Sequence, residues 1–161
     1  MEYTIREATP DDYEALLPVF DEGDAHHRHA LPHIFCDPDG PSRSKAYVNA
    51  LLADEDSAIF VAECEGQIVG EVKVALRETR DIPILVPRRY AHVDTLTVLQ
   101  AYRRAGIGRA LMERAHRWAL DKDVTEVELN VWEFNVGALA FYEDLGYTTT
   151  RRTMSKHLPE E

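Results

Sequence analysis

The sequence predicts a mixed α/β fold in one domain that spans residues 1–161. Three observations predict this fold class. Residues 57–64 and 68–78 are two β-type segments joined by a short turn, which predicts a hairpin. Residues 90–99 predict a strand that leads directly into an amphipathic helix, and the strictly alternating residues 124–132 predict another strand before a last helix. A chain of this length can bury a substantial core.

The N-terminal third predicts one strand, two helices and a long loop. Residues 3–9 predict the strand, and Pro10 then begins a helix over residues 11–23 with acidic residues in its first turn. Pro18 predicts a kink or an early end of that helix. Residues 24–42, with histidines, aspartates, a glycine and three prolines, predict a loop, and residues 43–54 predict the second helix.

The remaining elements follow in a regular order. After the hairpin and an irregular stretch over residues 79–89, the strand 90–99 precedes a helix with an apolar stripe formed by Ile107, Ala110, Leu111, Ala115, Trp118 and Ala119. The strand 124–132 precedes a helix over residues 135–145, which Gly146 ends. Residues 147–158 predict one or two final strands. The predicted order is β-α-α-β-β-β-α-β-α-β.

Charge and composition exclude several classes of function. The formal net charge of −11 argues against binding a nucleic-acid backbone, which requires a basic surface. It is compatible with attraction of a cationic substrate and equally with a solvated acidic surface. No apolar run approaches the ~20 residues of a membrane span, and the acidic N-terminus lacks a secretory signal. With Cys36 and Cys64 far apart, a reduced, cytoplasmic protein is expected.

A glycine- and arginine-rich turn lies between the strand 90–99 and the following helix. Gly106 and Gly108 allow close approach of a ligand to the helix N-terminus, where unpaired amides and the helix dipole favour an anion. Arg103, Arg104 and Arg109 can add charge-assisted hydrogen bonds to phosphate. The turn lacks the Lys-Ser or Lys-Thr pair of a P-loop and the third glycine of a dinucleotide fingerprint. Taken alone, it is equally compatible with a tight turn.

A second motif makes the phosphate interpretation more specific. Asn135, Ala138 and Tyr142 follow the pattern N-x-x-A-x-x-x-Y, and the segment ends in Leu-Gly-Tyr. Together with R-x-x-G-x-G at residues 103–108, this segment resembles the GCN5-related N-acetyltransferase (GNAT) family over residues 90–147. The N-terminal half resembles the family only in its order of elements.

The resemblance implies a fold and a cofactor. The fold would be a mixed, mostly antiparallel sheet, splayed at its central parallel strands and flanked by about four helices. Acetyl-CoA would bind as co-substrate, its pyrophosphate on the turn and its pantetheine arm along the preceding strand and in the splayed gap, much as an added strand. The implied cofactor-binding residues are Leu96, Thr97, Val98, Arg103, Arg104, Ala105, Gly106, Ile107, Gly108, Arg109 and Asn135.

The resemblance also suggests the catalytic groups. An amine attacks only when neutral, so a base must accept a proton, and a backbone amide near Val98 could stabilise the developing oxyanion. Tyr142 would protonate the leaving sulfur, its alternative being a core tyrosine. Alternation predicts one face for His92, Asp94, Leu96 and Val98. Asp94 is the preferred base and His92 the second.

Several other polar residues have alternative interpretations. Glu71 is a third candidate base, but its neighbour Lys73 on the same face favours a surface ion pair. Asn130 stands where some protein-N-terminus acetyltransferases of the family carry a glutamate, which weakens a peptide amine as acceptor. The histidines of residues 26–33 lack a convincing ligand pattern, so no metal is predicted. With residues 80–89, residues 26–35 are expected to shape the acceptor site, where Asp21, Glu22 and Asp24 could attract a cation.

These inferences predict an N-acetyltransferase. It would transfer the acetyl group of acetyl-CoA to a primary amine by direct attack in a ternary complex, without a covalent enzyme intermediate. A small-molecule amine is the first choice of acceptor, and a protein or peptide amine is the second. The alternative from another class is a regulatory module that binds acyl-CoA without turnover. No nucleic-acid or membrane partner is expected, and family resemblance is compatible with a homodimer formed through sheet edges or C-terminal strands.

Overall fold

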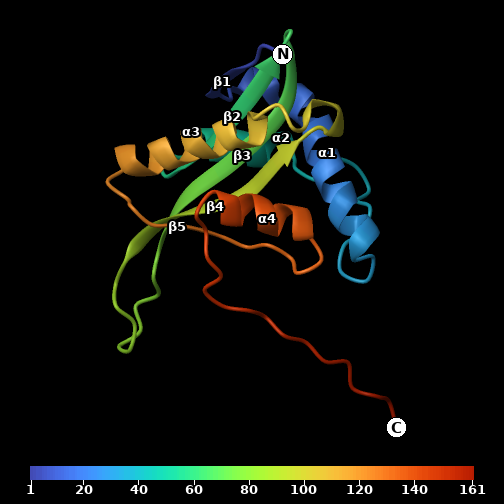
Figure 1. Ribbon diagram of the computed structural model, residues 1–161, viewed down its shortest axis with the longest axis vertical. Helices are drawn as coiled ribbons and strands as arrows, with labels where there is room; N and C mark the ends of the chain where they lie inside the picture. The colour runs from blue at the N-terminus through green and yellow to red at the C-terminus, as the bar shows by residue number, and fades with distance from the viewer. The chain divides into compact units, whose positions relative to one another are not determined.

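The computed structural model describes all residues from 1 to 161 and divides into two compact units, Met1–Asn130 and Val131–Glu161. The first unit contains a five-stranded sheet and three α-helices (Figure 1). Its strands are β1 (Thr4–Glu7), β2 (Ser57–Cys64), β3 (Gln67–Glu78), β4 (Arg89–Val98) and β5 (Val127–Leu129). Its α-helices are α1 (Tyr13–Ala30), α2 (Lys45–Ala53) and α3 (Ile107–Asp121), and short 3₁₀ turns, Pro10–Asp12 and Gln100–Tyr102, precede α1 and α3. The second unit contains one helix, α4 (Val136–Asp144).

The sheet confirms the predicted mixed, mostly antiparallel topology. Its strands follow the order β1-β2-β3-β4-β5, and only β4 and β5 are parallel. These two strands pair over three rungs, the last of which joins Val93 to Leu129. From Thr95 to Val98, β4 therefore pairs with β3 on one side and has no strand on the other. The sheet is splayed at the parallel pair, as expected.

Helices cover both faces of this sheet. Gly23 of α1 lies so close to β4 that an added Cβ would stand 2.7 Å from Thr97 Oγ1. On the other face, an added Cβ at Gly70 of β3 would stand 3.2 Å from Leu111 Cδ1 of α3. Thr97 and Val98 are consecutive strand residues, which point to opposite faces. The helices α1 and α2 thus form one layer with a core that includes Leu16, Phe20, Val48, Ile59 and Val61, and α3 forms the other.

The first helix differs from its prediction. Pro18 does not end it, and α1 continues to Ala30 through residues predicted as loop. A proline inside a helix leaves the carbonyl four residues earlier without its hydrogen bond. Here both Glu14 and Pro18 lie on the exposed side, where water can satisfy that carbonyl. Burial of Leu16, Val19 and Phe20 on the opposite side holds the helix to the sheet.

The C-terminal strands were also predicted wrongly. The one or two strands predicted over residues 147–158 are absent, and these residues contain no regular secondary structure. The alternating segment 124–132 forms a strand only over β5, Val127–Leu129. Alternation predicts which residues could pair, but a strand also needs a neighbouring edge with which to form hydrogen bonds. The predicted helix 135–145 is confirmed by α4, which begins after Asn135, whose side chain accepts a hydrogen bond from the amide of Ala138 (3.2 Å).

A β-bulge changes the faces of β4. Lys73 is paired with Thr95, but the next residue, Val74, is paired with Val93, so Asp94 is the extra residue. Residues directly opposite in a ladder point to the same face. His92 and Thr97 therefore share the α1 face with Glu71 and Lys73, whereas Leu96 and Val98 point to the α3 face. The predicted common face of His92, Asp94, Leu96 and Val98 was wrong, because simple alternation does not continue across a bulge.

Candidate active site

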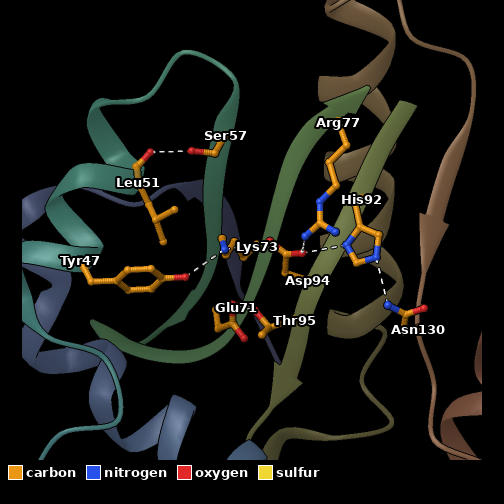
Figure 2. A network of polar contacts seen from close by, with 10 residues as sticks. All are labelled: Tyr47, Leu51, Ser57, Glu71, Lys73, Arg77, His92, Asp94, Thr95 and Asn130. Atoms are coloured by element: carbon orange, nitrogen blue, oxygen red, sulfur yellow. Dashed lines mark hydrogen bonds and ion pairs between the residues drawn. The ribbon is translucent and has the colours of Figure 1, made fainter. Parts of the chain in front are cut away.

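A cluster of charged and polar side chains lies on the α1 face of β3 and β4 (Figure 2). Asp94 is its centre. Its carboxylate contacts Lys73 Nζ at 2.8 Å, Arg77 Nη2 at 2.7 Å and His92 Nδ1 at 2.7 Å. Burial acts to raise the pKa of Asp94, but the hydrogen bonds from His92 and Lys73 outweigh it and hold that pKa at about 2. Asp94 is thus an ionised carboxylate that binds three donors.

This arrangement fixes the orientation of His92. An ionised carboxylate can only accept, so His92 Nδ1 carries the proton directed at Asp94. In the neutral ring, Nε2 then keeps its lone pair and lies 3.4 Å from Asn130 Nδ2. A histidine held in this way has one nitrogen that can accept a proton from another molecule. His92 is only 8% exposed, so that nitrogen is accessible from a restricted direction.

His92 lies at the point where the sheet divides. It is opposite Glu128 in the second rung of the parallel pair, and the pairing of β4 with β5 ends one rung later. The amide of Leu99 bonds to Val69 O on β3 (2.8 Å), so the alternating ladder directs the backbone groups of Leu96 and Val98 to the open edge. Arg103 Nε already binds Val98 O at 2.9 Å. The Val98 amide therefore also faces the open edge.

Thr97 differs from its neighbours on β4. It is paired with Glu71 in the ladder, and its backbone groups alternate with those of Leu96 and Val98, so they face β3. Its side chain lies beneath Gly23 of α1. Of the three β4 residues predicted to bind the cofactor, two therefore present backbone groups to the open edge and Thr97 does not.

The glycine turn continues from the same strand. Arg104 and Gly106 both have positive φ angles, 65° and 84°, and α3 begins at the next residue, Ile107. No side chain caps this helix, and the first amides of an α-helix cannot bond to a carbonyl of the same helix, so the helix begins at Ile107 with amide donors directed at the turn. Ile107 is buried against the sheet while Gly106 and Arg109 are exposed. Outward amides, a positive helix end and exposed arginines are a donor set that fits a pyrophosphate.

Glu71 is the predicted site residue whose environment differs most from expectation. The sequence favoured a surface ion pair with Lys73, which was wrong: Lys73 binds Asp94, and Glu71 is 0% exposed. Thr95 Oγ1 donates to Glu71 Oε2 at 2.9 Å, and Oε1 has no hydrogen-bond partner. Burial raises the pKa of Glu71 to about 7, against the lowering effects of Thr95 and of the Arg43 charge.

Two of the three acidic residues predicted to attract a cation have partners within the chain. Asp24 binds Arg43 at 2.8 Å, and the Arg43 guanidinium also lies 4.5 Å from the centre of the Phe20 ring. Glu22 accepts from the amide of Gln100 at 2.9 Å and lies 3.6 Å from Arg103. These contacts tie α1 to the segment before α2 and to the glycine turn. No group of three or more His, Cys, Asp or Glu side chains could hold a metal ion.

Sequence reasoning missed three members of the cluster. Thr95 and Arg77 were not singled out, and Lys73 was assigned to the wrong carboxylate. Every second residue of β3 points to the same face, and three of the four in this part of the strand are charged: Glu71, Lys73, Ala75 and Arg77. This pattern could have indicated that their side chains share one face of the sheet. The bulge at Asp94, which brings that carboxylate to Lys73, has no comparable signal in the sequence.

Asn135 and Tyr142 belong to the second unit. Asn135 is the residue before α4, and Tyr142 lies in its last turn, where its ring packs edge-on against Phe141 and Tyr147, with centroids at 5.2 and 5.7 Å. Burial raises the pKa of Tyr147 to about 12. The predicted roles of Asn135 and Tyr142 therefore rest on their motif.

A splayed sheet whose open strand leads into a glycine turn is the arrangement that the family resemblance implied, and comparison with known proteins agrees. The model of the acetyltransferase (GNAT) family matches residues 23–147, and this chain belongs to that family. An N-alpha-acetyltransferase of Sulfurisphaera tokodaii is 28% identical over 91% of this chain and 80% of its own length.

Solved structures share the fold. A mutant of the BH1408 protein from Bacillus halodurans has a TM-score of 0.91 and 29% identity, covering 97% of this chain and 99% of its own. The aminoglycoside N-acetyltransferase AAC(6')-Iy, solved in complex with CoA, has a TM-score of 0.71. It covers 98% of this chain and 95% of its own, and at 16% identity it shows the fold alone. None of the helices here has the length and apolar content that a membrane crossing requires.

Proposed function

We propose that this protein is an N-acetyltransferase that moves the acetyl group of acetyl-CoA to a primary amine by direct attack in a ternary complex. The observation that carries the proposal is the His92–Asp94 pair at the fork of β4 and β5, beside the open edge of β4. A base next to an edge that can pair with an extended cofactor arm brings the two reactants together. The glycine turn at the end of that edge supplies the anion site.

In this proposal His92 replaces Asp94 as the preferred base. Asp94, with its pKa held at about 2, is a poor proton acceptor at neutral pH, but it orients the ring and stabilises the imidazolium that forms. His92 Nε2 accepts a proton from the attacking amine. The Val98 amide stabilises the negative charge that develops on the thioester oxygen, and Tyr142 protonates the departing sulfur.

The acceptor is proposed to be a small-molecule amine. The acidic composition is compatible with a cationic acceptor, and Asn130, in contact with His92, stands where some N-terminus acetyltransferases carry a glutamate. A peptide α-amine is the second candidate, which similarity to an N-alpha-acetyltransferase over most of the chain supports. Thiol release from acetyl-CoA against polyamines, aminoglycosides, amino acids and short peptides tests both. Amine-dependent release establishes the enzyme and its acceptor class, whereas binding of acetyl-CoA without release from any amine supports the regulatory module. A cytoplasmic location and a homodimer remain predictions.

Replacing Gly106 with valine is expected to weaken CoA binding. Gly106 has φ 84°, a conformation that a β-branched residue rarely adopts, so the substitution would distort the turn at the proposed pyrophosphate site. Gly66→Val is a matched control, because Gly66 also has a positive φ, 78°, but lies in the β2–β3 turn. Calorimetry with CoA should show a loss of affinity for Gly106→Val alone. Equal affinities in the two variants contradict the phosphate assignment.

Replacing Tyr142 with phenylalanine is expected to lower kcat while CoA affinity is nearly retained. The substitution keeps the ring that packs against Phe141 and Tyr147 and removes only the hydroxyl. Loss of a general acid commonly costs about 10²-fold or more, and a thiolate is a moderately good leaving group, so the lower end is expected. Tyr147→Phe, in contact with Tyr142, is the control. Unchanged turnover of the Tyr142 variant removes it from the acid role.

A further inference from the structure

We propose that Thr95 and Glu71 form a proton relay for the acceptor amine. In this relay, which rests on the proposed function, Thr95 Oγ1 accepts a proton from the incoming ammonium group as it passes its own proton to Glu71 Oε2. The two side chains come from adjacent strands, β4 and β3, on the α1 face, as Figure 2 shows. His92 remains the base for the attack itself.

The state of Glu71 is the first observation that supports a relay. Its side chain is completely buried, one carboxyl oxygen binds Thr95 and the other has no partner. An unsatisfied buried polar atom destabilises the folded protein, so packing alone does not explain this residue. With a pKa of about 7, the carboxyl can take up and release a proton at neutral pH.

Access is the second observation. Glu71 has no exposed surface. Thr95, on the neighbouring strand and the same face of the sheet, is half-buried and therefore partly accessible. The Thr95 hydroxyl donates to Glu71 and keeps lone pairs that can accept from another group. A proton can thus reach Glu71 through Thr95 although the amine cannot touch the carboxyl. Gly23 allows α1 to approach this face closely, since an added Cβ there would meet Thr97.

The surrounding charges favour proton uptake from a cation and its later release. Lys73 on β3 and Arg43 before α2 both lower the pKa of Glu71 against the effect of burial, and the hydrogen bond from the Thr95 hydroxyl on β4 acts in the same direction. On the α1 side, Asp24 pairs with Arg43, and on α2 the Tyr47 hydroxyl accepts from Lys73. Asp94 is bound by Lys73 and Arg77. These groups keep the carboxyl close to balance between its two protonation states.

Two protons leave the amine nitrogen in each turnover, and in this proposal the relay and His92 accept one each. A primary amine enters as an ammonium ion, and the relay takes its first proton, which leaves a neutral nitrogen with a lone pair. That lone pair attacks the thioester carbon, the C–S bond breaks, and His92 takes the second proton from nitrogen. The thiolate receives one proton and becomes CoA thiol, so one proton per turnover passes to solvent. No oxidant or other reactant is needed.

The test compares two acceptors of similar shape, one an alkylamine that is charged at pH 7 and one an arylamine or hydrazine that is already neutral. Thr95→Val and Glu71→Gln are expected to lower kcat/KM by about 10²-fold for the charged amine and little for the neutral one. Thr95→Ser keeps the hydroxyl and is expected to restore the rate. His92→Gln is expected to slow both acceptors. Equal slowing of both by Thr95→Val indicates a structural role and overturns the relay, as does an unchanged rate with the charged amine.

A second measurement does not depend on turnover. Titration of the Glu carboxyl carbons by NMR, with Glu71 assigned by its absence in Glu71→Gln, is expected to show a pKa near neutrality. Thr95→Val should move this titration to higher pH, because it removes a hydrogen bond that favours the carboxylate, and Thr95→Ser should not. An unchanged titration in Thr95→Val overturns the coupling. If the wild-type protein instead releases no thiol with any amine, the proposed function fails while the measured coupling still stands, so the two failures are distinguishable.

Discussion

Replacement of His92 by glutamine lowers kcat by about 10²–10⁴-fold with nearly unchanged CoA affinity, which is the range expected for loss of a general base. Glutamine can still donate a hydrogen bond to Asp94, but it has no nitrogen that accepts a proton near neutral pH. His92 lies in the part of β4 that pairs with β5, and the residues that face the open edge follow it in the chain. CoA binding at the glycine turn is therefore not expected to change. Steady-state kinetics and calorimetry on the same preparation separate the two effects.

Two further variants make the assignment specific. His116→Gln is a matched control, since His116 lies on α3, on the opposite face of the sheet, and should retain activity. Asp94→Asn is expected to move the acidic limb of the pH–rate profile to lower pH, because the imidazolium loses the carboxylate that stabilises it. If His92→Gln retains the wild-type rate, another group accepts the proton. If the acidic limb of the pH–rate profile does not move in Asp94→Asn, the orienting role of that carboxylate is contradicted.

Replacement of Glu71 by glutamine is expected to change the pH dependence of stability. The folded-state pKa of Glu71, about 7, lies above its ordinary value of 4.5, so between these values the folded protein binds more protons than the unfolded chain. The free energy of unfolding of the wild type therefore falls as pH rises through this window. The free energy of unfolding of Glu71→Gln, measured relative to that of the wild type, should therefore be higher at pH ~8 than at pH ~4 by on the order of 3 kcal/mol.

Urea unfolding at several pH values measures this difference. Comparing the two proteins at each pH removes any packing cost of the amide itself, since that cost does not titrate. Asp12→Asn provides a control of opposite sign, because the hydrogen bonds from Arg6 lower the pKa of Asp12 to about 2. The stabilisation that ionised Asp12 gives the wild-type protein is present above the ordinary pKa of an aspartate and is lost as pH falls toward 2. Parallel stability profiles of wild type and Glu71→Gln would contradict the perturbed carboxyl.

The sequence by itself predicted most of the helices and strands and a candidate anion site. The hairpin of β2 and β3, the strand β4 and the helix α3 follow from local patterns of apolar residues, because those patterns have the period of the structure they form. Gly106 and its neighbours were identifiable because glycines and arginines directly before an amphipathic helix are typical of an anion site, and the matching motif at Asn135 narrowed the family. Both are signals carried by residues close together in the chain.

The tertiary structure decided which polar side chains meet. The bulge at Asp94 brings that carboxylate to Lys73 and His92, and it depends on how β4 pairs with β3 rather than on any residue of β4 alone. Glu71 has the same local pattern as an exposed strand residue, yet α1 buries it. The continuation of α1 past Pro18 has the same cause, since contacts with the sheet outweigh one missing hydrogen bond. Burial and register depend on residues distant in sequence, and these decide which carboxylate is ionised and which can carry a proton.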